Sequence, residues 1–135
     1  MSFEIAAIDH LVLRTTHMSA MLKFYGGVLG CAIERDVREE FGLVQLRAGT
    51  GLIDIVDVDS KLGAMGGGPP STTGNNLDHF CLQVDVLCEE DILKRLDEHG
   101  VEHGALERRY GAQGYGNSVY LKDPDGNTVE LRERL

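Results

Sequence analysis

The sequence has no tryptophan, only three prolines, and only three cysteines, none of which forms a Cys-x-x-Cys pair. An odd number of separated cysteines does not suit a disulfide framework, so we expect a reducing compartment, the cytoplasm. No apolar run approaches the roughly 18 residues that a membrane-spanning helix needs. The first ten residues lack the basic and long apolar segments of a signal peptide. We therefore predict neither a membrane protein nor a disulfide-rich secreted one.

Basic residues are also scarce. Thirteen Lys and Arg stand against 22 Asp and Glu, which gives a formal net charge of −9. Such a surface repels a polyanion and contains no basic run to offset this, so nucleic-acid binding is not expected. The 135 residues, 42% of them apolar, suit one domain or two small halves that share a core.

The chain contains an internal repeat. The segment Ile8-Asp9-His10-Leu11-Val12-Leu13 reappears 69 residues later as Leu77-Asp78-His79-Phe80-Cys81-Leu82. Each copy is followed by residues with helical apolar spacing and then by three strand-like runs. The expected helices cover 18–29 and 89–99, and the expected strands cover 31–37, 41–48, 51–57, 103–109, 117–121 and 128–132. This order predicts an α+β fold of two βαβββ modules, at 5–58 and 77–135, within one domain spanning 1–135.

Two glycine-rich segments interrupt this pattern. Residues 59–76 contain five glycines and two prolines, and residues 110–116 contain three glycines. Long stretches without periodicity are usually linkers or functional loops. We interpret 59–76 as the linker between the modules, and we expect both segments to supply the walls of a binding pocket.

Four residues at repeat-related positions suggest metal chemistry. Strand alternation places His10 and His79 on the face opposite the aliphatic side chains of their strands. By the same alternation Asp54, between Ile53 and Ile55, and Glu130, between Val129 and Leu131, lie opposite their aliphatic neighbours. A single strand histidine or acid is usually only hydrogen-bonded or solvated, but the repetition of both is hard to attribute to chance. Imidazole and carboxylate are the ligands that divalent first-row metals prefer, so we predict a metal site.

The same segments carry a family resemblance. The runs IDHLVL, FYGGVLG, LIDIV, LDHFCLQV and VYLKDPDGNTVEL together resemble the vicinal oxygen chelate superfamily, which includes glyoxalase I, bleomycin resistance proteins and extradiol dioxygenases. The resemblance extends from Ile8 to Arg132. It implies paired βαβββ modules whose curved mixed sheet cups a divalent metal held by His10, Asp54, His79 and Glu130.

The resemblance also implies partners. Arg14 matches an arginine that glyoxalase I places near the glutathione carboxylate, so it is expected to bind substrate. Relatives of the glyoxalase type commonly form homodimers in which the N-terminal half of one subunit meets the C-terminal half of the other. Each metal site then draws ligands from both chains.

The favoured function is a metal-dependent lyase or isomerase of the glyoxalase I type. It would act on a small substrate with vicinal oxygens through an enediolate-like intermediate. Glu130 is the preferred catalytic base because its longer arm can move off the metal, and Asp54 would be a second base or a weaker ligand. Nickel or zinc is the preferred metal, while iron, manganese and cobalt also suit these ligands.

Alternative functions remain open within the same resemblance. An extradiol-type dioxygenase would hold Fe(II) with His10, His79 and Glu130 and leave positions open for a catechol and O₂. A thiol transferase of the fosfomycin-resistance type uses a similar triad. A metal-free binding protein like the bleomycin resistance proteins would use the acidic surface to attract a cationic drug.

Overall fold

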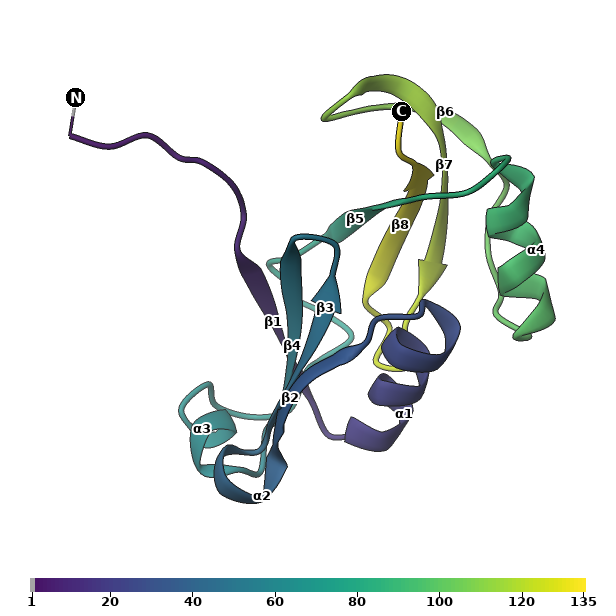
Figure 1. Ribbon diagram of the computed structural model, residues 1–135. Coiled ribbons are helices and arrows are strands. Elements are labelled where there is room, and N and C mark those ends of the chain that lie inside the picture. Colours follow the sequence, from purple (N-terminus) through teal and green to yellow (C-terminus); the bar gives the residue numbers. More distant parts are fainter. Residues whose placement is uncertain (1) are drawn as a thin grey trace. The chain divides into compact units, whose positions relative to one another are not determined.

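The computed structural model describes residues 2–135 and separates into two compact units, Met1–Pro70 and Ser71–Leu135 (Figure 1). Each unit contains a four-stranded mixed sheet with the same strand order and the same pairing directions. The predicted α+β fold of two repeated βαβββ modules is therefore confirmed.

In the first unit, strand β1 (His10–Thr15) is followed by helix α1 (Met18–Leu22) and by the π-helical segment η1 (Lys23–Val28). The remaining elements are β2 (Ile33–Val37), α2 (Arg38–Phe41), β3 (Leu43–Ala48), β4 (Gly51–Asp57) and α3 (Lys61–Ala64). The sheet order is β1-β4-β3-β2, with β1 parallel to β4 and the other pairs antiparallel. The two central strands contribute most of the buried aliphatic side chains, which include Val44, Leu46, Ile53 and Ile55.

The predicted first helix is present but is not α-helical throughout. Only its first turn is α-helical, and from Lys23 onward it becomes a π-helix in which the amide of Leu29 donates to the carbonyl of Phe24. Gly26 and Gly27 lie in this stretch. Because glycine stabilises an α-helix only weakly, the α-helical form has little advantage over the π-helical form there. Phe24 and Tyr25 remain buried, so the change of winding does not expose the apolar stripe.

The second unit repeats this plan. It contains β5 (His79–Val84), α4 (Glu90–Glu98), β6 (Glu107–Gly111), β7 (Gly114–Lys122) and β8 (Thr128–Glu133), in the sheet order β5-β8-β7-β6. Acidic residues lie in the first turn of α4 and Arg95 in its last, as the helix dipole favours. Ile92 and Leu96 form the buried face of this helix.

The segment 110–116 differs from its prediction. It is not a loop but the tip of a hairpin, because β6 continues to Gly111 and β7 begins at Gly114. The register pairs Tyr110 with Tyr115 and Gly111 with Gly114, which leaves a two-residue turn. Gly114 has a φ of 93°, which glycine adopts without the steric cost that other residues meet.

The segment 59–76 is only partly irregular. Ser60 caps the short helix α3 by accepting a hydrogen bond from the amide of Gly63, with N–Oγ at 2.9 Å. The boundary between the two units, after Pro70, falls within this segment. Among the described residues, no helix is long and apolar enough to cross a membrane.

Candidate functional site

The first unit brings His10 and Asp54 to one face of its sheet. Parallel pairing aligns Asp54 of β4 with Val12 of β1, which lies two residues after His10. Alternation therefore places His10 and Asp54 on the same side of the sheet. Asp54 is buried, with only 4% of its surface exposed. Its Oδ2 accepts a hydrogen bond from Gln45 of β3 at 3.1 Å, but its Oδ1 has no hydrogen-bond partner among the described residues. A buried carboxylate oxygen without a partner is costly, and a cation would satisfy it.

Asp9 holds the ring of His10. The Nδ1 atom of His10 lies 2.7 Å from Oδ1 of Asp9. The hydrogen bond to Asp9, followed by the charge of Asp54, raises the pKa of His10 above its ordinary value. When the imidazole is neutral, this contact places its proton on Nδ1 and leaves the lone pair on Nε2. Metal-binding histidines are commonly oriented by such a carboxylate partner.

The second unit repeats this arrangement with His79 and Glu130. Nδ1 of His79 lies 2.6 Å from Oδ2 of Asp78, and Nε2 lies 3.5 Å from Oε1 of Glu130. Glu130 is buried, like Asp54, at 6% exposure. Each unit therefore presents one histidine, oriented by the aspartate that precedes it, beside one buried carboxylate.

A polar side chain from the neighbouring strand accompanies each buried acid. Gln45 of β3 donates a hydrogen bond to Asp54. Tyr120 of β7 is the register partner of Glu130, and burial, followed by hydrogen bonding to Glu130, raises the pKa of the Tyr120 phenol. The ring of Tyr120 also lies edge-on to His79, with centroids 5.3 Å apart, and the guanidinium of Arg109 lies 4.2 Å from the Tyr120 ring centroid.

Sequence reasoning missed these four supporting residues. Asp9 and Asp78 could have been found, because the dipeptide Asp-His occurs in both copies of the repeat. Gln45 and Tyr120 carried no local signal, since their roles depend on strand register.

Arg14 lies on the same face of β1 as His10, but its guanidinium is already engaged. Nη1 donates to the carbonyl of Gly68 at 2.7 Å, and Nη2 donates to Gly67 at 2.7 Å and to Gly63 at 3.1 Å. Arg14 therefore fixes the segment 63–68 against the edge of the sheet.

Cys81 is the register partner of Glu130 on β5. Burial, followed by hydrogen bonding to Glu130, raises the pKa of the Cys81 thiol to about 12. The thiol is therefore protonated at neutral pH and is a poor nucleophile there.

The donor set of each unit suits part of a divalent metal site. One imidazole and one carboxylate are two ligands, whereas a structural or catalytic site of this type uses three or four from protein. Among the described residues of either unit taken by itself, no three His, Cys, Asp or Glu side chains come close enough together to hold a metal. The unpartnered oxygen of Asp54 and the oriented histidines fit a metal, but each pair needs further ligands to complete the site.

Comparisons with known proteins agree with this architecture. The virulence protein STM3117 of Salmonella typhimurium is 28% identical over 128 residues, which cover 93% of this chain and 83% of that protein. A lactoylglutathione lyase from Agrobacterium tumefaciens has a similar structure, with a TM-score of 0.67, 22% identity, and coverage of 96% and 94% of the two chains. TnmS3, an antibiotic-binding protein from Streptomyces sp. CB03234, gives a TM-score of 0.72, 19% identity, and coverage of 98% and 99%.

The two structural likenesses show a common fold between proteins whose names describe different activities. The family model that matches residues 7–131 spans most of both modules and includes all four candidate ligands. The chain therefore belongs to the Glyoxalase/Bleomycin resistance protein/Dioxygenase superfamily.

Proposed function

We propose that this protein is a metal-dependent lyase or isomerase of the glyoxalase type, which acts on a small substrate with two neighbouring oxygens. The observation that carries the proposal is the repeated pair of an aspartate-oriented histidine and a buried carboxylate. Burying a carboxylate costs free energy unless the carboxylate is paired. Each pair of histidine and buried carboxylate is therefore better explained by the binding of a cation than by a contribution to folding.

His10, Asp54, His79 and Glu130 would hold the metal. Asp9 and Asp78 accept hydrogen bonds from Nδ1 and so direct Nε2 to the ligand position. Nickel or zinc is the preferred ion. When bound, such an ion supplies Lewis-acid polarisation of the substrate oxygens.

Glu130 is the proposed base. Its carboxylate would take a proton from one substrate carbon and return it to the adjacent carbon, and its side chain, one methylene longer than that of Asp54, has the greater reach. Asp54 has a shorter side chain, and its Oδ2 accepts a hydrogen bond from Gln45. It therefore suits the role of metal ligand or secondary base better than that of the main base.

Arg14 would contribute to substrate binding. Because it holds three carbonyls of 63–68, it fixes one edge of the face that carries His10. We propose that it serves substrate binding chiefly through this segment.

We further propose a homodimer in which each site combines the first unit of one chain with the second unit of the other. The two-ligand set of each unit supports this, since neither set can complete a site alone. Mixing single variants tests it directly. His10→Ala and His79→Ala should each lose metal, while His99→Ala should retain it.

Random re-pairing of the two defective variants should restore about a quarter of the wild-type metal content, because half of the dimers would regain one of two sites. Elemental analysis of the re-paired mixture measures this. No recovery would reject the shared site, and equal metal content in all three single variants would reject the four-ligand assignment.

Activity is tested on the metal-loaded protein with the thiohemiacetal of a 2-oxoaldehyde, with solvent deuterium incorporation as the check on proton transfer. Isomerisation with deuterium uptake is expected. Consumption of O₂ with a catechol, without isomerisation, would assign the chain to the dioxygenase branch instead. Tight binding of a cationic drug by metal-free protein, without turnover, would assign it to the binding proteins.

A further inference from the structure

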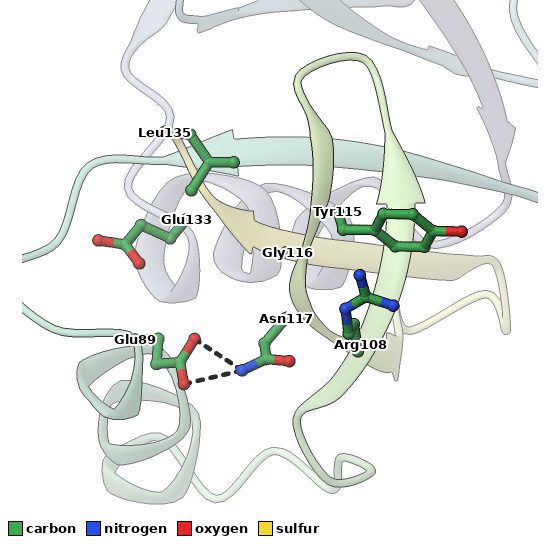
Figure 2. A pocket seen from close by; sticks show the side chains of 7 residues that line it. All are labelled: Glu89, Arg108, Tyr115, Gly116, Asn117, Glu133 and Leu135. Atoms are coloured by element: carbon green, nitrogen blue, oxygen red, sulfur yellow. Dashed lines mark hydrogen bonds between the residues drawn. The ribbon is translucent and has the colours of Figure 1, made fainter.

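A cavity lies in the second unit, on the face of its sheet opposite to His79 and Glu130. It has a volume of about 270 Å³ and is lined by Glu89, Arg108, Tyr115, Gly116, Asn117, Glu133 and Leu135 (Figure 2). Alternation separates the two sites, because Glu130 and Glu133 are three residues apart on β8 and point to opposite faces. Arg108 and Asn117 are register partners on β6 and β7, so they share this second face.

The basic side of this cavity is a guanidinium on an aromatic ring. The Cζ atom of Arg108 lies 3.7 Å from the centroid of the Tyr115 ring. Among the described residues, Arg108 forms no ion pair, whereas Arg109 pairs with Glu107 and Arg134 with Asp85. Stacking orients the guanidinium but leaves its N–H donors for an anion, and the planar fork suits a carboxylate.

The acidic side of the cavity is formed by Glu89 and Glu133. Both carboxylate oxygens of Glu89 accept from the single amide nitrogen of Asn117, at 2.9 and 3.1 Å. A neutral amide does not compensate the charge, and no Lys, Arg or His in residues 2–135 forms an ion pair with Glu89 or Glu133. In Figure 2 these two acids lie to the left, Arg108 and Tyr115 lie to the right, and Asn117 lies between them.

We propose that this cavity binds a small zwitterion that carries one carboxylate and one primary ammonium group. The carboxylate would pair with Arg108, the ammonium would pair with Glu133 and Glu89, and the aliphatic carbons would lie along Tyr115 and Leu135. The volume is slightly below the roughly 300–1,000 Å³ of sites for drug-sized ligands, which favours a short amino acid. A simple anion would meet two carboxylates, and a simple amine would leave Arg108 unpaired, so both charges are required.

The probe is 4-aminobutanoate, added to the ¹⁵N-labelled full-length protein and compared with butylamine and butanoate. The amide signals of Tyr115, Gly116 and Asn117 should shift with the zwitterion, while those of His79 and Cys81 should not. Butylamine and butanoate should each bind about tenfold more weakly or worse, because each lacks one charge-assisted contact. Glycine, 3-aminopropanoate and 6-aminohexanoate then report which charge separation fits best.

Variants link the binding to the named residues. Arg108→Gln and Glu133→Gln should each weaken 4-aminobutanoate binding about tenfold or more. Lys94→Gln and Glu98→Gln are matched charge controls on α4 and should bind as the wild type does. Tyr115→Leu keeps every charge but removes the platform under Arg108, so it should also weaken binding, and thermal melts of each variant verify folding.

Three results would overturn the proposal. The first is the absence of shifts at Tyr115, Gly116 and Asn117 with every amino acid of the series. The second is butylamine binding as tightly as 4-aminobutanoate, which would show a simple attraction of cations to acids. The third is unchanged binding in folded Arg108→Gln protein.

Discussion

The Nδ1 atom of His79 lies 2.6 Å from the carboxylate of Asp78, and the same contact recurs 69 residues earlier between His10 and Asp9, at 2.7 Å. Adjacent residues on an extended strand point to opposite sides, and each of these aspartates directly precedes the strand that its histidine begins. Regular alternation alone would therefore not bring the aspartate carboxylate to the imidazole of the next residue. The recurrence of this contact in both modules indicates that orienting the histidine is a property of the fold repeat.

The aspartate–histidine contact is open to test by mutation. Asp78→Asn removes the charge that holds Nδ1 but leaves all four proposed ligands in place. Metal affinity should fall about 10- to 100-fold, the usual effect of losing such an orienting partner. A competition titration with a metal-binding dye measures it. Asp59→Asn, an exposed aspartate in another part of the chain, is the control, and an Asp78→Asn affinity equal to that of this control would contradict the orienting role.

Ligand and base can be separated at Glu130. Glu130→Gln keeps an oxygen that can bind metal but cannot accept a proton near neutral pH. Metal content should be largely retained, while isomerisation falls by about 10²–10⁴, the usual contribution of a positioned base. Asp54→Asn should reduce turnover less. If Glu130→Gln turns over normally and Asp54→Asn does not, the two roles are exchanged.

His103 should make stability depend on pH. Its Nδ1 lies 2.6 Å from the carbonyl of Gly104 and its Nε2 lies 2.7 Å from Asp97, so both nitrogens face acceptors and the doubly protonated ring is favoured. The hydrogen bond to Gly104, and then that to Asp97, raises the pKa of His103. A raised pKa in the folded state gives stability that is complete below the ordinary value of about 6.5 and is lost as pH rises through the folded-state pKa.

Urea unfolding at pH 5.5 and pH 8.5 measures this contribution. The wild type should lose more stability over this interval than His103→Gln, in which the titrating group is absent. His99→Gln, which removes an exposed histidine nearby, should keep the wild-type slope. Identical slopes for wild type and His103→Gln would show that the two contacts do not favour the protonated ring.

Replacing Gly63 by any larger residue should destabilise the fold for steric reasons. A Cβ atom at this position would collide with the backbone carbonyl of Asp57 at the end of β4, and backbone cannot move aside as a flexible side chain can. Gly63→Ala should therefore destabilise the protein by about 1–3 kcal/mol. Gly68→Ala, where a Cβ would meet nothing within 4 Å, should change stability by less than about 0.5 kcal/mol. Chemical denaturation of both variants decides the matter.

The amino-acid sequence was sufficient to predict the repeat, the order of strands and main helices in each module, and the strand faces that carry His10, Asp54, His79 and Glu130. These follow from local rules, since alternation along a strand depends only on position in the chain. The preference of glycine for turns likewise places the ends of several elements. Local patterns could not show the π-helical winding around Gly26 or the hairpin at 110–116. Each depends on which backbone N–H and C=O groups pair with one another, and the side-chain pattern does not specify this.

The side chains that support the candidate ligands, in contrast, are brought to them by strand pairing. Gln45 reaches Asp54, and Tyr120 reaches Glu130, through the register of strands that are separated along the chain by 9 and 10 residues. The cavity between Arg108 and Glu133 depends in the same way on three strands and the start of a helix meeting at one place. Such contacts are set by how whole elements pack and pair, and a one-residue change in register would move every one of these side chains to the other face.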